Sequence, residues 1–377
     1  MTDMNARRQQ RRVELDPPTS PTTPAAADAP PERSEQKRAD DPDIGAEIED
    51  LIAKVGGEPA TFDGKLIRDM MVTALKLIPD KRDTGELKLM TAALKELRYA
   101  YRVFGQYPER LKISIFGSAR TPPGHPDYAA AVEFSRLMAQ AGWMVITGAG
   151  DGIMRAGHEG PGRESSFGVA IRLPFETTAN EVIAGDEKLI HFRYFFTRKL
   201  MFLSQAEAVA LFPGGFGTMD EAYETLTLVQ TGKASMIPIV MLEGGGRDYW
   251  EEWLAFNKHR LLGDGWISEE DLGLFHIASS PADAAESITR FYRVYHSSRY
   301  VRDNLVIRLR HAISPSDVER LADEFRVLIK SGTMSLRGPY PEEDDHLDLP
   351  RLIFVHTRHK FGLVRRLIDR INDCKPA

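Results

Sequence analysis

The stretch Ala208–Glu221, with the sequence AVALFPGGFGTMDE, joins an apolar run of strand length to the start of a helix through a glycine-rich turn. Gly214, Gly215 and Gly217 let the backbone approach a ligand closely. The helix start offers unpaired N–H groups and the positive end of the helix dipole, so a phosphate group fits such a turn. Considered alone, the glycines are explained equally well by a tight turn that needs positive φ.

Apolar runs of strand length recur on both sides of this stretch and alternate with helical segments, as in a parallel α/β sheet. The predicted strands cover Ile113–Phe116, Trp143–Thr147, Gly168–Arg172, Ala208–Phe212 and Ile237–Leu242. The predicted helices run from Pro126 to Gly142, from Thr218 to just before Gly232, from Arg247 to Leu262 and from Ser280 to Tyr295. The sequence therefore predicts an α/β domain over residues 109–296.

The chain before this domain changes character near residue 44. Residues 1–43 are rich in Pro, Ala, Thr and charged residues and hold almost no large apolar residue, so we expect a disordered tail. Residues 44–108 carry apolar side chains at helical spacing, among them Leu66, Met70 and Leu77. This helical extension is expected to cover a flank of the main domain or a subunit interface.

The sequence pattern of residues 297–377 predicts a small α+β appendage. Its predicted elements are the strand Leu305–Leu309, the helix Ser314–Leu328, the strand-like Met334–Leu336, the strand Leu352–His356 and the helix Phe361–Ile371. The acidic run Glu342–Asp345 indicates a solvated loop. Basic residues are scattered over this segment and could bind an anionic effector, although such a scatter is more often a solvated surface. They are Arg308, Arg310, Arg351, Arg358, Lys360, Arg365 and Arg366. Since no catalytic motif lies here, we expect the appendage to regulate activity or assembly.

Composition narrows the functional class. The 377 residues carry a net charge of −6 and a pI near 6.0, which argues against a nucleic-acid binder but permits a small anionic ligand in a basic pocket. The single cysteine, Cys374, has no partner for an intrachain disulfide, and no apolar run approaches the roughly 18 residues that span a bilayer. Proline-rich sequence follows the paired arginines near the start, so they are not a twin-arginine signal. We expect a cytoplasmic protein without membrane or nucleic-acid partners.

Acidic side chains follow the glycine turn at helical spacing. Glu221 is expected in the first turn of a helix that Thr218 starts, where the dipole favours the ionised carboxylate. Glu224 and Thr227 follow on the same face, each about one turn later. A carboxylate beside a phosphate-binding turn repels the ligand unless it has another task, such as binding ribose hydroxyls or directing water. The alternative role, a capping carboxylate, fits Asp220 better.

Two adjacent cations, Arg198 and Lys199, stand near the start of the apolar helix that leads into the strand Ala208–Phe212. Cations at a helix N-terminus oppose the dipole, so this position calls for a compensating anion. A substrate phosphate is one such anion. The alternative is a pair of surface side chains whose apolar stems lie along the helix.

Taken together, these motifs resemble those of the lonely guy (LOG) family of nucleotide phosphoribohydrolases. The resemblance rests on Arg198-Lys199 and on Pro213–Glu221, with Arg198 and Glu221 separated by 23 positions. Two further stretches agree, Phe116–Arg120 after the first predicted strand and Thr147–Met154 after the second. The similar region covers residues 110–245, and the joint pattern is far more specific than a single glycine-rich turn.

The resemblance implies a Rossmann-like fold with flanking helices, a homodimer or larger homo-oligomer, and hydrolysis of the N-glycosidic bond of nucleoside 5′-monophosphates without a cofactor or metal. Arg198 and Glu221 match the catalytic pair of the family. The substrate-binding residues expected in this chain are Glu176, Lys199, Gly214, Gly215, Phe216, Gly217, Thr218, Glu224, Thr227, Gly117 and Ser118.

The helical extension and the appendage are absent from the small cytokinin-activating members of the family. The chain therefore resembles the larger bacterial branch, which implies nucleotide catabolism or AMP nucleosidase activity. Asp151 stands where many relatives have proline and Arg155 where many have glutamate, which leaves the preferred base open. Members also carry the label lysine decarboxylase, but the sequence offers no cofactor-anchoring lysine with an acidic partner for a pyridine ring.

Two other functions stay open. A non-catalytic carrier of a nucleotide or of the molybdenum cofactor shares the fold and the glycine turn, although the joint presence of Arg198, Lys199 and Glu221 argues against it. A regulator that handles phosphoribosyl compounds under control of the appendage would show turnover only incidentally.

Overall fold

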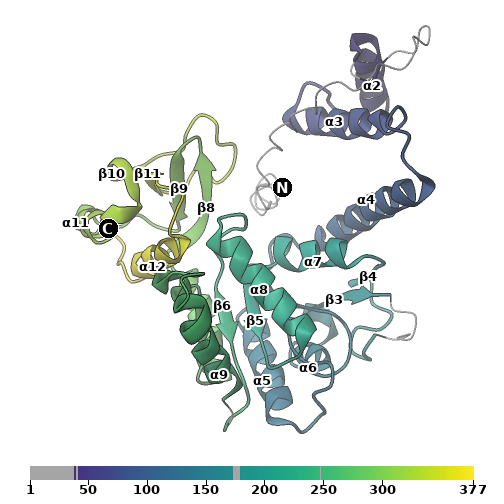
Figure 1. Ribbon diagram of the computed structural model, residues 1–377. Helices are drawn as coiled ribbons and strands as arrows, with labels where there is room; N and C mark the ends of the chain where they lie inside the picture. Colours follow the sequence, from purple (N-terminus) through teal and green to yellow (C-terminus); the bar gives the residue numbers. More distant parts are fainter. Residues whose placement is uncertain (1–37, 40, 173–178, 247) are drawn as a thin grey trace. The chain divides into compact units, whose positions relative to one another are not determined.

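The computed structural model describes residues 38–39, 41–172, 179–246 and 248–377 (Figure 1). The described residues up to Lys95 form one compact unit, and Glu96–Ala377 form a second one. Within these described ranges no helix is long and apolar enough to cross a membrane.

Helices make up the unit before Lys95, as the apolar spacing predicts. Asp41 caps the first helix by accepting the N–H of Asp43 at 3.2 Å, and Thr61 caps the second by accepting the N–H of Gly64 at 3.0 Å. The third helix continues into the second unit. These elements are α2 (Pro42–Lys54), α3 (Phe62–Lys76) and α4 (Thr84–Phe104).

A parallel sheet forms the centre of the second unit. Its described strands are β1 (Lys112–Phe116), β2 (Met144–Thr147), β3 (Ser166–Ile171), β4 (Leu189–Phe192), β5 (Ala208–Leu211), β6 (Ile239–Met241) and β7 (Phe275–Ile277). They follow the order β4-β3-β2-β1-β5-β6-β7, and all neighbouring pairs are parallel. The chain adds strands outward from β1 to β4 and then crosses to the other side of β1 with β5. The predicted α/β class is confirmed, and the direction change places a crevice between the carboxyl ends of β1 and β5.

The sequence pattern does not predict β4 or β7. Both are short, and both lie at the ends of the described strand order. Only alternate residues of β4 are buried, and those of β7 are all half-buried. An edge strand that meets water on one side lacks the continuous apolar run that marks a central parallel strand.

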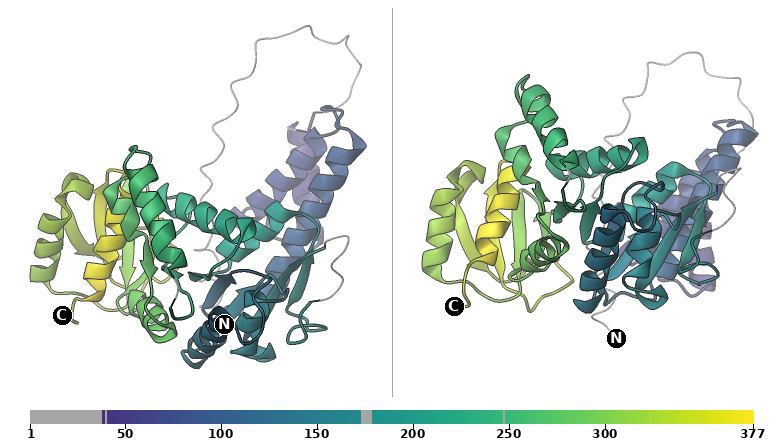
Figure 2. Two further views of the ribbon diagram at one scale, coloured as in Figure 1. Left: turned by 60° about the horizontal axis from the view of Figure 1, so that its bottom comes forward. Right: turned by 90° about the horizontal axis from the view of Figure 1, so that it is seen from below.

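Helices cover both faces of the sheet (Figure 2). Ile113, Ile115 and Val145 pack with α5, α6 and α10 on one face, while Phe116 and Met144 pack toward α7 and α8 on the other. The helices of this part are α5 (Pro126–Gln140), α6 (Ile153–Glu159), η1 (Arg163–Ser165), α7 (Phe195–Ser204), α8 (Phe216–Gln230), α9 (Tyr249–Phe256), η2 (Asn257–Leu262), η3 (Glu269–Gly273) and α10 (Pro281–Phe291).

Several predicted helix bounds are wrong. α8 begins at Phe216, two residues before Thr218. The predicted helix end at Leu262 is confirmed, although the helix becomes π-helical after Phe256 as η2. α10 ends at Phe291 rather than at Tyr295. Asn372 explains this early end, because its side-chain oxygen accepts the N–H groups of Val294 at 2.8 Å and of Tyr295 at 2.9 Å and holds them at the start of a strand.

The C-terminal segment forms an antiparallel sheet with two helices beside it. Its described strands follow the order β10-β11-β9-β8. The first strand and the full length of β10 were not expected from the sequence, whereas the other predicted elements are present. The elements are β8 (Tyr295–Val301), β9 (Asn304–Leu309), α11 (Pro315–Glu324), η4 (Arg326–Leu328), β10 (Ile329–Arg337), β11 (Arg351–His356) and α12 (Phe361–Asn372).

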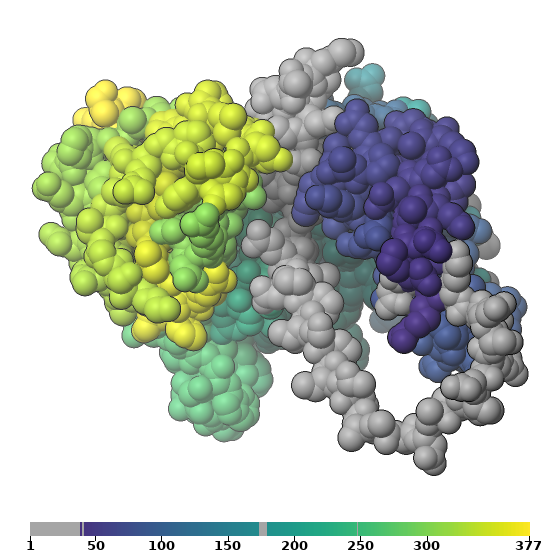
Figure 3. All heavy atoms as spheres, turned by 90° about the horizontal axis from the view of Figure 1, so that it is seen from above, coloured from purple at the N-terminus to yellow at the C-terminus, as the bar shows by residue number. Residues whose placement is uncertain are grey.

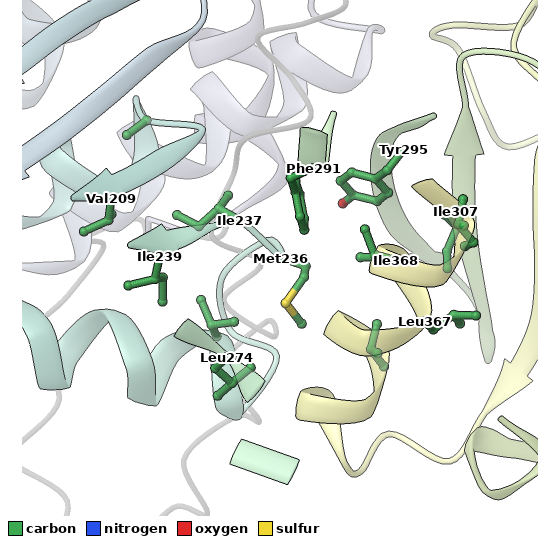
Figure 4. Close-up of a cluster of buried hydrophobic side chains, with 14 of the residues drawn as sticks. Val209, Met236, Ile237, Ile239, Leu274, Phe291, Tyr295, Ile307, Leu367 and Ile368 are labelled. Atoms are coloured by element: carbon green, nitrogen blue, oxygen red, sulfur yellow. The ribbon is translucent and has the colours of Figure 1, made fainter. Parts of the chain in front are cut away.

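One hydrophobic cluster runs from the parallel sheet into this segment. Figure 4 shows Met236, which precedes β6, between Leu274 on one side and Ile368 of α12 on the other. Phe291 and Tyr295 continue the cluster toward β9, with ring centroids 5.1 Å apart. At the surface, the C-terminal residues form one continuous green-to-yellow mass (Figure 3).

The acidic run Glu342–Asp345 is not a solvated loop, so that prediction is wrong. Glu343 and Asp345 are buried, and Arg308 Nη2 lies 2.6 Å from Glu343 Oε1 and 2.5 Å from Asp345 Oδ1. Arg351 Nε lies 3.1 Å from Glu343 Oε2. Arg308 and Arg351 are direct partners in the antiparallel pair of β9 and β11, and two buried guanidinium groups side by side need anions.

The two arginines therefore belong to a buried ion cluster rather than to a basic surface. Burial on its own raises the pKa of Glu343, but the N–H of Tyr340 and the guanidinium groups of Arg351 and Arg308 outweigh it and hold this pKa below its ordinary value. The cluster ties the loop before β11 to the sheet.

We predict that Arg351→Met lowers the free energy of unfolding by about 3–5 kcal/mol, because it leaves the Glu343 carboxylate buried without one of its cations. Urea denaturation followed by circular dichroism measures the loss. The matched control is Arg302→Met, whose ion pair with Glu342 is exposed and is expected to contribute less than about 1 kcal/mol. Equal losses in the two variants would contradict a special role for the buried cluster.

Candidate functional site

The large pocket of the α/β part opens at the carboxyl ends of β1, β2, β3 and β5. It has a volume of about 1220 Å³ and is lined by residues 115–120, 148–150, 170–172 and 214–219, together with side chains from α7 and α8. β1 and β5 flank the point where the strand order reverses, which is where ligands of parallel α/β sheets bind.

Most of the residues singled out from the sequence meet at this pocket. Among the described residues, those that line it are Arg198, Glu221, Gly117, Ser118, Gly214, Gly215, Phe216, Gly217 and Thr218. Lys199, Glu224 and Thr227 are not part of that lining. Glu176 lies outside the described residues.

The glycines of the turn occur for two different structural reasons, packing at Gly214 and open space at Gly215 and Gly217. None of Gly214, Gly215 and Gly217 has positive φ, so a tight left-handed turn does not explain them. A Cβ on Gly214 would lie 2.1 Å from Thr218 Oγ1, which makes glycine necessary there for packing. A Cβ on Gly215 or Gly217 would meet no described atom within 4 Å. These two glycines leave open space in front of the backbone at the start of α8, as a bound group requires.

Neighbouring loops fix the position of this turn. Ser118 donates its N–H to the carbonyl of Pro213 at 3.1 Å, and the hydroxyl of Tyr249 donates to the carbonyl of Gly214 at 2.6 Å. A Cβ on Gly117 would lie 2.6 Å from Ile153, so this glycine serves the packing of α6. Tyr249 was not expected from the sequence, because a tyrosine at a helix start carries no local signal of such a contact.

A buried network supports the floor of the pocket behind β2. His158 Nε2 lies 2.9 Å from Thr147 Oγ1, which accepts the N–H of Ala149 at 3.0 Å. The side-chain amide of Asn180 contacts the other ring nitrogen and donates to the carbonyl of Gly150 at 3.0 Å. Burial lowers the pKa of His158 to about 4, so the ring is neutral at ordinary pH and acts as a structural link. This histidine was also missed from the sequence.

Arg198 reaches the pocket from α7 between two aromatic rings. Its guanidinium carbon lies 4.9 Å from the centroid of Phe195 and 5.7 Å from that of Phe202. The anion that the helix start calls for is provided by the chain, because Glu96 accepts the N–H of Arg193 at 2.8 Å and the hydroxyl of Thr197 at 2.7 Å. The compensating anion at the start of α7 is therefore Glu96, so the position of Arg198 does not by itself require a substrate phosphate.

Lys199 points toward α8 and holds its acidic side chains. Its Nζ lies 2.5 Å from Glu224 Oε2, 2.9 Å from Asp220 Oδ2 and 3.7 Å from Glu221 Oε2. Burial on its own lowers the pKa of Lys199, but these carboxylates outweigh it and raise the pKa above its ordinary value. Glu224, expected at the substrate, and Asp220, expected to cap the helix, are both partners of this lysine.

Glu221 is a buried carboxylate whose pKa is raised to about 7. Burial is the main cause, since the residue is 5% exposed and its Oε2 accepts no hydrogen bond from the described residues. Lys199 and Arg198 lower this pKa, while Glu224 and Asp220 raise it. The expectation that the helix dipole favours the ionised form is wrong: α8 begins at Phe216, so Glu221 lies in its second turn, beyond the reach of the dipole.

Part of the α/β region is similar to a known protein family. Residues 148–288 match the family model described as "Possible lysine decarboxylase". This match covers less than half of the chain and includes Arg198, the glycine turn and Glu221. It supports the resemblance to the LOG family that the motifs carry. No curated protein matches the chain.

Solved structures resemble the chain at low identity. The molybdenum cofactor binding protein from Rippkaea orientalis is 22% identical with a TM-score of 0.34, over 48% of this chain and 96% of that one. The molybdenum cofactor carrier protein from Chlamydomonas reinhardtii is 18% identical with a TM-score of 0.32, over 48% and 98%. DNA processing protein A from Helicobacter pylori is 13% identical with a TM-score of 0.28, over 44% and 77%. At these scores the solved structures assign no function to the chain.

We predict that Glu221→Gln becomes more stable relative to the parent protein as the pH rises. The folded parent binds a proton at Glu221 up to about pH 7, whereas the unfolded chain releases it near 4.5. The stability that this proton provides is complete below 4.5 and is lost as the pH rises through 7. Glutamine does not titrate in this range, so the unfolding free energy of the variant does not decrease for this reason as the pH rises.

Urea denaturation at pH 5 and pH 8 measures the effect. The difference in unfolding free energy between variant and parent is expected to shift by about 2–3 kcal/mol in favour of the variant. Asp220→Asn, which changes an exposed side chain, serves as the control and should give a much smaller shift. An unchanged difference for Glu221→Gln would show that this carboxyl is not desolvated.

Proposed function

We propose that this protein hydrolyses the N-glycosidic bond of nucleoside 5′-monophosphates, releasing a free base and ribose 5-phosphate. One observation carries the proposal: a single pocket contains both an open glycine turn at a helix start and, beside it, a buried carboxylate with a cation close by. A phosphate and a sugar on one substrate would use these two features together.

The phosphate is proposed to bind at Gly215–Thr218. The start of α8 has no side-chain cap hydrogen bond among the described residues, and an added Cβ on Gly215 or Gly217 beside it would meet no described atom within 4 Å. Such an end binds an anion through charge-assisted hydrogen bonds. Because the phosphate is remote from the bond that breaks, its binding energy can position that bond.

Glu221 is proposed to act on the sugar. When the C1′–N bond breaks, its electron pair stays on the base nitrogen and the ribose ring gains positive charge. The ionised carboxylate stabilises this charge and accepts a proton from the water whose oxygen bonds to C1′. The base takes up a proton from solvent water and leaves, and Glu221 then releases the proton it accepted to solvent, so that one water is consumed in each turnover. A pKa of about 7 suits a group that accepts a proton near neutral pH.

Arg198 and Lys199 are proposed to have separate tasks. A guanidinium does not release a proton at accessible pH, so Arg198 orients the nucleotide and offsets charge on the phosphate or the leaving group. Lys199 instead keeps the acidic cluster of α8 in place and limits the rise in the pKa of Glu221. The adjacent cations of the motif thus serve the substrate and the catalytic carboxylate respectively.

Decarboxylation of lysine fits the pocket poorly. A pyridoxal phosphate enzyme needs a lysine Nζ in the pocket to hold the cofactor as a Schiff base. The part of the lining that the structure describes contains no lysine, and Lys199 is paired with the carboxylates of α8. The nucleotide reaction uses the groups that are present.

We further propose that AMP is among the substrates, as in the larger bacterial branch, and that the protein acts as a homo-oligomer.

We predict that Glu221→Gln lowers kcat for AMP by roughly 100-fold or more, because the electrostatic and proton-accepting roles are lost while the shape is kept. The parent kcat/KM should rise as the pH increases through about 7, where the carboxyl loses its proton. Free adenine measured by chromatography between pH 5 and pH 9 tests both points. Asp220→Asn, outside the pocket lining, should change kcat only a few-fold. Near-parental turnover in Glu221→Gln would remove this residue from the mechanism.

We also predict that kcat/KM for AMP exceeds that for adenosine by at least about 100-fold, since adenosine lacks the group that two or more charge-assisted hydrogen bonds would hold. The same assay with both compounds gives the ratio. Equal values would contradict the phosphate anchor. Tight binding of AMP by calorimetry without release of any base, from AMP, GMP, CMP or UMP, would instead indicate a nucleotide carrier.

A further inference from the structure

A second cavity, of about 330 Å³, lies at the opposite edge of the parallel sheet. Leu111, Trp143 and Glu207 line it and directly precede β1, β2 and β5, so the cavity sits at the amino ends of the strands, away from the glycine turn. Tyr295 and Ser297 of β8 line its other side. The C-terminal segment therefore forms one wall of the cavity.

The walls of this cavity have a definite chemistry. Trp143 and Tyr292 are aromatic, with ring centroids 5.9 Å apart, and Trp143 is 3% exposed. Ser297 and Ser298 add hydroxyl groups beside them. Arg310, the cation of the lining, is exposed at the rim. Glu109 and Glu207 add carboxylates to the lining, and Glu207 is buried and accepts the N–H of Lys112 at 2.6 Å. An aromatic wall with hydroxyl groups and carboxylates suits a flat ring that carries N–H groups, and the carboxylates repel a phosphate.

The volume of the cavity also favours a small ring system over a whole nucleotide. About 330 Å³ lies at the lower end of the range of small-molecule sites, roughly 300–1,000 Å³, whereas the pocket at the glycine turn is several times larger. The smaller cavity accommodates a base without its sugar and phosphate.

Both helices that carry the candidate catalytic pair reach this cavity. Leu203 lines it from α7, the helix of Arg198, and Thr225 lines it from α8, the helix of Glu221. The hydroxyl of Thr225 donates to the carbonyl of Glu221 at 2.7 Å. A ligand here would contact the inner surfaces of α7 and α8 without entering the active pocket.

We propose that this cavity is a regulatory site for a free nucleobase, held between the amino edge of the parallel sheet and β8. Its effect on turnover rests on the proposed hydrolysis, in which a base is the product, but the binding itself does not. The site gives the C-terminal segment a direct connection to α7 and α8.

Calorimetry on the full chain with adenine, hypoxanthine, cytosine and uracil as probes tests the binding. The background is Gly215→Phe, which places a bulky ring in the lining of the active pocket, at a position where an added Cβ meets no described atom within 4 Å. Adding Ala234→Trp, which fills the cavity from its loop, should abolish binding, and adding Thr231→Trp, which places the same bulk on the same loop outside the lining, should not. If Ala234→Trp does not fold, Ser297→Phe fills the cavity from the other side.

At least one base is expected to bind to Gly215→Phe at millimolar concentration or below. In the otherwise unaltered protein, the same base should change kcat for AMP by at least about 5-fold, and Ala234→Trp should remove this response. No binding of any of the four bases, or binding that persists in whichever cavity-filling variant folds, overturns the site. Binding without a change in kcat overturns the regulatory role alone, and loss of hydrolysis in the parent protein leaves the calorimetric test intact.

Discussion

The burial of one carboxylate, Glu221, constrains the geometry around the pocket. Burial of an ionised carboxylate is costly unless cations lie near it, whereas a fully formed ion pair would lower its pKa. Lys199 meets both demands, because its closest contacts are Asp220 and Glu224 while Glu221 stays 3.7 Å away. Through Lys199, α7 is thus linked to the acidic side chains of α8, and the same two helices carry Arg198 and the end of the glycine turn.

The sequence was most informative where the local pattern and the buried environment agree. The central strands are apolar without interruption because both faces of the sheet are covered, so their positions and the α/β class follow from periodicity. The gathering of Arg198, Ser118 and Gly215 at one pocket follows from parallel strands, whose carboxyl ends share an edge. That edge could be predicted from the alternation of strands and helices alone.

The remaining features depend on partners that are distant in the sequence. The acidic run before β11 looks solvated until the register of β9 and β11 places Arg308 beside Arg351. Lys199 looks like a substrate cation until α8 is known to pack against α7. The ionisation of Glu221 depends on how deeply it is buried, which the helix start did not reveal. The acidic run and Lys199 were assigned to solvent and to ligand because their protein partners lay elsewhere in the chain, and the burial of Glu221 likewise depends on residues outside its own helix.

The hydrophobic cluster that passes from β5 and β6 through Met236 to α12 bears on how the molecule folds. Because the parallel sheet and the C-terminal sheet share their main apolar core, we expect them to unfold together rather than separately. The C-terminal residues, although remote from the glycine turn, thus contribute to the free energy that keeps the pocket in shape. Truncation of the buried side chains of α12 is therefore expected to lower the stability of the central strands as well.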